Sequence, residues 1–264
     1  MKYLFSAWDE LRPLCQKAAL FLFMDYDGTL APIAETPAEA KILPENKKIL
    51  EELSNVPDIK LAIISGRAMG DIKSRVGLKN IIYAANHGLE IDGPKIKFKS
   101  PIGPNFRKTI KSIYSGLKDR LAEVKGVLIE DKELSLSLHY RLVKKAEVPK
   151  VKAVSHELMI IPLVQKKLRV TSGKKVLEVR PRVEWDKGKV TLWLLARQQF
   201  AQGSKKVLPV YIGDDLTDED AFKVLRNKGI TIAVGKASGS YAQFYLEDAV
   251  EVGEFLKRIK ICRI

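Results

Sequence analysis

The chain has 264 residues, of which 46% are hydrophobic, and its formal net charge is +14. This composition excludes a disordered chain, and the length suits one large domain or two smaller ones. No apolar run approaches the roughly 20 residues that span a bilayer. Acids at positions 9 and 10 interrupt the apolar patch near the N-terminus too soon for a signal peptide. We therefore expect a cytoplasmic protein that does not act at a membrane.

The positive charge is concentrated in the middle third of the sequence. Residues 94–181 contain 21 Lys and Arg against 8 Asp and Glu. Such a segment is compatible with nucleic acid, a membrane surface or a small anionic substrate. The basic residues stand singly and in pairs, without interleaved aromatic residues or a known binding motif, so we do not expect a nucleic-acid partner. The two Cys and three His residues show no disulfide or zinc spacing.

A helix with amphipathic spacing over residues 6–18 leads into the first predicted strand. That strand, residues 20–24, is continuously apolar, as a parallel strand covered on both faces is, and it stops at Asp25. Asp27 follows, and Gly28 lets the chain turn away. Ligands of open α/β sheets bind at this end of the strands. The stretch alone fits either a Mg²⁺ site or a plain polar turn.

A crossover helix over residues 44–54 separates the first strand from a second apolar strand, residues 59–64, which ends at Ser65. A hydroxyl there is suited to donate a hydrogen bond to a phosphoryl oxygen, and equally to cap the helix that follows. A third strand, residues 81–85, precedes Asn86, His87 and Gly88 at the corresponding place. The repetition predicts one shared rim of polar side chains.

The pattern changes over residues 101–183, which we interpret as an insert. The predicted order there is helix, hairpin, helix, hairpin, with helices over 105–124 and 148–166 and strands over 126–130, 134–142, 168–171 and 175–180. This order favours a small antiparallel sheet with helices on one side. Such an insert can act as a lid over the strand ends or simply stabilise the rest of the chain. The remainder, residues 1–100 and 184–264, would form the core domain.

After the insert, Lys187 stands just before a helix predicted over residues 190–199. A cation beside a helix N-terminus suits phosphate, although a lone lysine is more often a surface residue. A further apolar strand, residues 207–212, ends at a run of acids that includes Asp214 and Asp218. These acids suit a Mg²⁺ site but not an EF-hand. The last elements predicted are a final strand and a closing helix, over 229–234 and 254–259.

In this order, Asp25 with Asp27, Ser65, Lys187 and Asp214 with Asp218 resemble the four motifs of the haloacid dehalogenase superfamily of phosphotransferases. The insert is similar to the larger cap of its sugar-phosphatase branch. More narrowly, the chain resembles the trehalose-6-phosphate phosphatase family in the stretches DYDGTLAPI, ISGR, ANHG, EDK followed by LHYR, and VLEVRPRVEWDKGK. The resemblance implies an α/β fold: a Rossmann-like core with a mainly parallel sheet, plus an inserted α+β cap of order αββαββ.

The resemblance also implies roles for individual residues in Mg²⁺-dependent hydrolysis of trehalose 6-phosphate. Asp25 would be the nucleophile that forms an aspartyl phosphate, and Asp27 the general acid and base. Ser65 and Lys187 would bind the transferring oxygens. The metal residues would be Asp25, Asp27 through its carbonyl, Asp214 and Asp218, the last also supporting Lys187. The substrate-binding residues expected are Glu130, Lys132 and Glu178, with Arg67, His87, His139, Arg141 and Arg180 as further ones.

Two alternatives remain open at this point. A sibling enzyme would use the same motifs on glucosyl- or mannosyl-3-phosphoglycerate or on sucrose phosphate. A protein of another class would bind nucleic acid through its basic surface on a degenerate enzyme scaffold. For the enzyme we expect a monomer that acts on a small sugar phosphate, with a trehalose-6-phosphate synthase as a candidate partner.

Overall fold

The computed structural model describes residues 1–173, 175–202, 206–236 and 238–263. The chain divides into two compact units, which we call the core unit, residues 1–99 and 185–264, and the insert unit, residues 100–184. Each unit has a hydrophobic core of its own. No helix in the described part of the chain combines the length and the hydrophobicity that crossing a bilayer requires.

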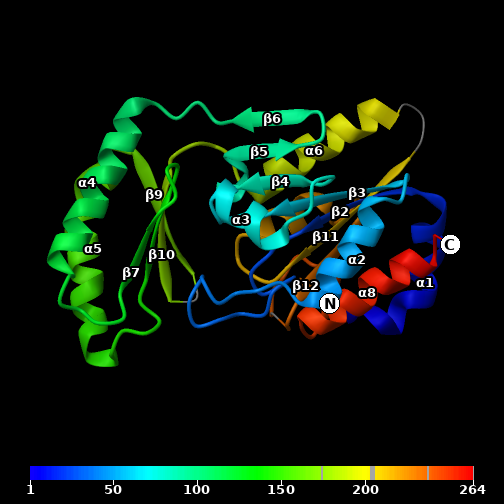
Figure 1. Cartoon of the computed structure of the whole chain (residues 1–264), viewed down its shortest axis with the longest axis horizontal. Coiled ribbons are helices and arrows are strands. Elements are labelled where there is room, and N and C mark those ends of the chain that lie inside the picture. The colour runs from blue at the N-terminus through cyan, green and yellow to red at the C-terminus, as the bar shows by residue number, and fades with distance from the viewer. Residues whose placement is uncertain (174, 203–205, 237, 264) are drawn as a thin grey trace. The chain divides into compact units, whose positions relative to one another are not determined.

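In the described part of the core unit, nine strands form one sheet in the order β1-β13-β12-β11-β2-β3-β4-β5-β6 (Figure 1). Neighbours from β1 to β4 pair in parallel, whereas β4, β5 and β6 pair antiparallel. The strands are β1 Lys2–Tyr3, β2 Ala19–Met24, β3 Ile59–Ile64, β4 Ile82–Ala85, β5 Glu90–Gly93, β6 Ile96–Lys99, β11 Val207–Gly213, β12 Ile230–Val234 and β13 Phe244–Leu246. The predicted α/β fold with a mainly parallel sheet is confirmed.

Helices cover both faces of this sheet, as the continuously apolar β2 requires. Along β2, Leu20, Leu22 and Met24 pack into one cluster and Phe21 and Phe23 into the other. Helices α1, α2, α3 and α8 contribute to the first cluster, and α6 and α7 to the second. The helices are α1 Trp8–Lys17, α2 Pro44–Ser54, α3 Met69–Val76, α6 Lys187–Gln202, α7 Glu219–Leu225 and α8 Ala249–Ile261, with short 3₁₀ turns η1 Leu4–Ala7 and η2 Asn86–Gly88.

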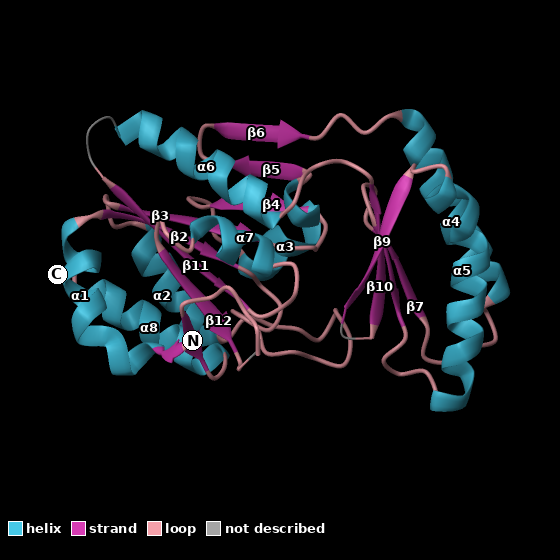
Figure 2. Cartoon of the chain, turned by 180° about the vertical axis from the view of Figure 1, so that it is seen from behind, coloured by secondary structure: helices cyan, strands magenta, loops and turns pink. Residues whose placement is uncertain are grey.

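The insert unit has the predicted order αββαββ. Its four strands form an antiparallel sheet in the order β7-β8-β10-β9, and α4 and α5 lie on one side of it (Figure 2). The elements are α4 Pro104–Arg120, β7 Leu128–Asp131, β8 Leu136–His139, η3 Lys145–Glu147, α5 Val148–Val164, β9 Leu168–Gly173 and β10 Val176–Pro181. The apolar alternation in β8 is confirmed, because Leu136 and Leu138 are buried in one cluster with residues of α4 and α5.

Several predictions about elements were wrong. The short strands β1, β5, β6 and β13 and the helix α7 were missed, so β12 is not the final strand. Helices α6 and α8 begin three and five residues earlier than predicted, at Lys187 and Ala249. Asp248 caps α8 by accepting hydrogen bonds from Val250 N and Glu251 N, a signal that the leucine and isoleucine spacing alone does not carry.

The short side chains on the polar face of the insert sheet are covered by their neighbours. Ser135 and Ser137 are buried. Ser137 pairs with Glu130 on one side and Glu178 on the other, so the small hydroxyl lies between two longer side chains of the same face.

Candidate active site

Three neighbouring parallel strands end in polar residues at the same edge of the core sheet. Strands β2 and β3 are followed by Asp25 and Ser65, and β11 by Asp214. The backbone N–H of Asp25 donates to Ile212 O at 2.9 Å, and Ser65 N donates to Ala84 O at 2.9 Å. Main-chain hydrogen bonds from the sheet thus fix the positions at which these side chains leave the backbone.

Lys187 reaches this edge from the first residue of α6. Its Nζ lies 2.9 Å from Asp25 Oδ2 and 2.9 Å from Asp218 Oδ1. The side chains of Lys187 and Asp218 are 1% and 0% exposed. One buried ammonium therefore faces two buried carboxylates.

Asp218 is held by four donors. Its Oδ1 accepts from Lys187 Nζ and, at 2.8 Å, from the Tyr211 hydroxyl. Its Oδ2 accepts from the backbone N–H groups of Asp214 and Asp215, both at 3.1 Å. Asp218 thereby fixes the loop that carries Asp214, and Tyr211 joins the site although its sequence position in β11 gave no sign of it.

Burial and charge shift the pKa values of this group strongly. Burial raises the pKa of Asp25 well above its ordinary value and that of Asp218 to about 7, although the Lys187 ammonium lowers both. Burial alone lowers the pKa of Lys187, but the two carboxylates raise it well above its ordinary value. For Asp215, Lys187 and the Thr217 hydrogen bonds outweigh burial and lower the pKa to about 2. A further cation at this edge would help to keep the acids ionised.

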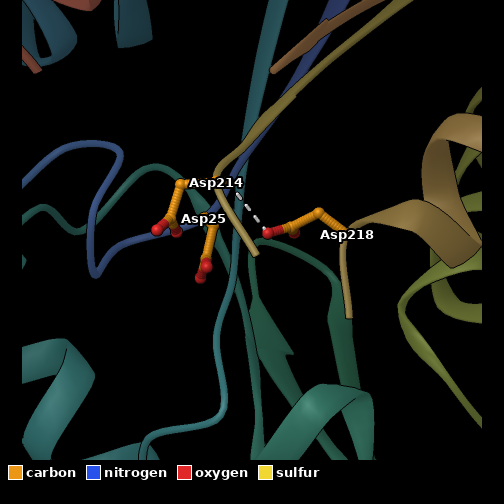
Figure 3. Close-up of side chains that lie close together, drawn as sticks. All are labelled: Asp25, Asp214 and Asp218. Carbon is orange, nitrogen blue, oxygen red and sulfur yellow. Dashed lines mark hydrogen bonds between the residues drawn. The ribbon is translucent and has the colours of Figure 1, made fainter. Parts of the chain in front are cut away.

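Asp25, Asp214 and Asp218 form a cluster that fits a divalent cation (Figure 3). One carboxylate oxygen from each lies within 4.8 Å of the others. At Gly28, which has φ +78°, an added Cβ would lie 2.2 Å from Asp214 Oδ2, so the glycine leaves the room that this carboxylate occupies. The donor set consists of oxygens, which hard cations such as Mg²⁺ prefer.

Asp27 is bound by Arg67. The guanidinium donates from Nε to Asp27 Oδ2 at 2.7 Å and from Nη2 to Oδ1 at 2.6 Å. It also donates to Asp71 Oδ2 at 2.6 Å and to Pro37 O at 2.9 Å, and it lies over the Tyr26 ring. The structure therefore shows Arg67 as a buried partner of Asp27, and its predicted contact with substrate stays a prediction.

His87 lies in the turn that follows β4. Asn86 and His87 both have left-handed φ values, 51° and 56°, and both are buried. His87 N donates to Ser65 O at 2.9 Å, and Asn86 N donates to Arg67 O at 2.8 Å. The turn thus braces the backbone on both sides of Gly66.

The predicted residues of the insert unit gather on the polar face of its sheet. His139 Nε2 lies 2.7 Å from Glu130 Oε2, Lys132 Nζ 3.5 Å from Glu178 Oε1, and Arg180 Nε 3.8 Å from Glu178 Oε2. Arg141 is exposed in the turn after β8. The structure thus brings five of the six insert residues together, and separately it brings together Asp25, Asp27, Ser65, Arg67, His87, Lys187, Asp214 and Asp218 in the core unit.

The family model described as trehalose-phosphatase matches residues 23–249. The chain belongs to the trehalose-phosphatase family. One similar relative is a probable trehalose-phosphate phosphatase 4 of Oryza sativa subsp. japonica. It is 36% identical to this chain over 260 residues, and the match covers 96% of this chain and 69% of the relative. Trehalose-phosphate phosphatase B of Arabidopsis thaliana is 35% identical over 269 residues, covering 96% and 70%.

Solved structures agree with the trehalose-phosphatase assignment. The C-terminal domain of Candida albicans trehalose-6-phosphate phosphatase superposes with a TM-score of 0.77 at 25% identity, and the match covers 96% of both chains. A haloacid dehalogenase-like hydrolase from Bacteroides thetaiotaomicron shares the fold, with a TM-score of 0.63 at 18% identity over 92% of this chain and all of the other. The predicted family and enzyme class are confirmed.

Proposed function

We propose that this chain is a Mg²⁺-dependent phosphatase that hydrolyses trehalose 6-phosphate to trehalose and phosphate. The names of its relatives support the substrate. The observation that carries the chemistry is the meeting of Asp25, Lys187 and Asp218 at one sheet edge, with Asp214 in the same cluster. A buried carboxylate beside a buried ammonium provides a nucleophile and a phosphate-binding cation in contact.

We assign the metal to the Asp25 and Asp214 carboxylates and the Asp27 carbonyl. Asp218 lies in the same cluster, but four donors already occupy its two oxygens, so we assign it mainly to the support of Lys187 and of the loop from Asp214. When bound, Mg²⁺ would shield the anionic nucleophile from the anionic phosphate.

The reaction proceeds in two displacements at phosphorus. An oxygen of Asp25 attacks the phosphorus and the bond to the sugar oxygen breaks, while Asp27 gives that oxygen its proton. Asp27 then takes a proton from the water that attacks the aspartyl phosphate, and the carboxylate of Asp25 leaves as phosphate is released. Ser65 and Lys187 bind the transferring oxygens in both steps. Ser65 Oγ accepts from Arg67 N at 3.2 Å, so its own proton can be directed at the substrate.

Protonation of Asp27 weakens its two hydrogen bonds to Arg67, because the carboxyl loses the negative charge that strengthens them and one of its oxygens becomes a donor. The protonated carboxyl can then turn from the guanidinium toward the sugar oxygen. The side chain is 44% exposed, so solvent-facing space is available for that rotation.

We propose that the insert unit is the cap and that Glu130, Lys132 and Glu178 bind the sugar hydroxyls, with His139, Arg141 and Arg180 beside them and His87 on the core unit. Carboxylates accept hydrogen bonds from hydroxyls, and the adjacent cations hold them in place. The division into core and cap domains, the monomeric state, the cytoplasmic location and the synthase partner stay predictions.

Phosphate release from a panel of sugar phosphates tests the substrate. The panel contains trehalose 6-phosphate, glucosyl- and mannosyl-3-phosphoglycerate and sucrose phosphate, each with and without Mg²⁺. We expect a kcat/KM for trehalose 6-phosphate at least tenfold above the others, and activity only with the metal. Equal turnover of another member would assign the chain to a sibling activity, and DNA retention without any phosphate release would refute the enzyme.

A further inference from the structure

The chain passes between the two units twice, after residue 99 and after residue 184. An aromatic residue of the core unit stands at each crossing: Phe98 at the end of β6, and Trp185. Their ring centroids are 5.9 Å apart, and Trp193 of α6 lies 5.9 Å from Phe98 and 6.5 Å from Trp185. One aromatic cluster thus fixes both crossing points to α6.

Trp185 also reaches the turn behind Ser65. Its Nε1 donates to Gly88 O at 2.7 Å. Gly88 has φ +91°, and a Cβ there would lie 3.0 Å from Trp185 Nε1 and 1.9 Å from Val190 Cγ2. The indole and the start of α6 therefore pack directly on the backbone of this turn.

The turn needs such support, because Asn86 and His87 hold left-handed conformations that non-glycine residues rarely adopt. Through His87 N, the turn donates to Ser65 O. Lys187 follows Trp185 by two residues in the chain, and its side chain enters the site and contacts Asp25. Trp185 is therefore hydrogen-bonded to the turn that supports Ser65, and it lies two residues before Lys187 in the chain.

We propose that Trp185 is a positioning residue, which fixes the spacing between Ser65 and Lys187 through its hydrogen bond to Gly88 O. The inference rests on the proposed function, because it takes Ser65 and Lys187 as the pair that binds the transferring oxygens. A shift of either side chain by a fraction of an ångström would misplace the phosphoryl group, and errors of about 1 Å typically cost about 100-fold in rate.

Trp185→Phe tests this, because it keeps an aromatic ring and removes the N–H. The matched control is Trp193→Phe, in the same cluster. With an aryl phosphate, we expect Trp185→Phe to lower kcat about tenfold and to weaken inhibition by orthovanadate, an analogue of the transferring phosphoryl group, by a similar factor. The kcat of Trp193→Phe and its inhibition by orthovanadate should stay within about twofold of the values of the parent chain. Both variants should unfold at similar temperatures.

A second measurement needs neither turnover nor the Trp185 substitution. Trp8→Phe/Trp193→Phe leaves Trp185 as the sole tryptophan of the chain. Its emission should shift when inorganic phosphate and Mg²⁺ are added. Unchanged kcat and vanadate inhibition in Trp185→Phe would overturn the proposal. So would a Trp185 fluorescence emission that does not change when phosphate and Mg²⁺ are added. Failure of the parent chain to hydrolyse trehalose 6-phosphate would instead refute the proposed function, and the aryl phosphate and fluorescence experiments would still decide the role of Trp185.

Discussion

Arg67 donates hydrogen bonds to both carboxylate oxygens of Asp27, with N···O distances of 2.7 and 2.6 Å. The two residues lie 40 positions apart, and the guanidinium is fixed in turn by Asp71, Pro37 O and the Tyr26 ring. The proposed general acid and base is thus held by a buried cation, which connects it to the loop after β2 and to α3.

Replacing Arg67 should destabilise the core unit. Arg67→Met removes the hydrogen bonds to Asp71 and to Pro37 O. Asp71 keeps those from Arg75, but the partly buried Pro37 O loses this donor, which costs about 2 kcal/mol of the free energy of unfolding. Arg67→Lys should recover only part of it, because an ammonium cannot form the planar fork. Urea unfolding measures both, with Arg12→Met, at an exposed position of α1, as the control. Equal unfolding of Arg67→Met and the control would contradict the contact network.

The lowered pKa of Asp71 predicts that the stability of the chain depends on pH. Burial works against the charged form, but hydrogen bonds from Arg75 and Arg67 outweigh it and lower the pKa of Asp71 below its ordinary value of 3.8. A lowered folded-state pKa stabilises the protein above the ordinary value, and the stabilisation is lost as the pH falls through the folded-state pKa. Asp71→Asn should therefore be less stable than the parent chain above about pH 4, and this difference should shrink at lower pH.

Urea midpoints measured across that range check the prediction. Asp9→Asn, at an exposed position of α1, reports the general effect of removing one acid. A difference between Asp71→Asn and the parent chain that grows as the pH falls would mean that the Asp71 carboxylate is not stabilised by its two arginines.

Gly28→Ala should damage the metal site. The new Cβ would lie 2.2 Å from Asp214 Oδ2, so this carboxylate must leave its position in the cluster. We expect the Mg²⁺ concentration for half-maximal activity to rise at least tenfold, a change of about 1.4 kcal/mol in binding. Gly235→Ala is the matched control, since Gly235 has a similar φ of +82° and no neighbouring atom within 4 Å of its added Cβ. An unchanged Mg²⁺ requirement in Gly28→Ala would argue against Asp214 as a ligand.

Lys187→Met should both abolish turnover and destabilise the chain by about 3–5 kcal/mol, because it leaves Asp25 and Asp218 buried without their ammonium. Adding Asp218→Asn removes one of these charges, so the double variant should be more stable than Lys187→Met alone. Lys189→Met, two residues along and exposed, serves as the control. If the double variant is the less stable one, the two carboxylates do not share the cation in the way the distances indicate.

Much of the core unit could be predicted because its strands are unambiguous. The apolar runs of β2 and β3 have no polar interruption on the core side, and α2 begins with a proline at its first turn, so their bounds follow from local chemistry. Strands β5 and β6 mix charged and apolar residues over four positions each, and only pairing along the sheet edge makes them strands.

The site shows the same division. The order of its acids along the chain predicts which strand ends meet, since parallel neighbours share one edge. The partners of those acids could not be read in this way. Tyr211 binds Asp218 from within a strand, and Arg67 binds Asp27 across the turn after β2, so both depend on tertiary packing rather than on a local pattern.

In the proposed reaction, Asp25 receives the phosphoryl group. Asp27→Asn removes the base that hydrolyses the intermediate, whereas an aryl leaving group needs little protonation to depart. In acid-quenched samples of this variant with Mg²⁺ and an aryl phosphate, mass spectrometry should find one added phosphoryl group, on the peptide that carries Asp25. Asp25→Asn/Asp27→Asn should show none. Steady phosphate release by Asp25→Asn, or a phosphoryl group on the peptide of the double variant, would contradict the account.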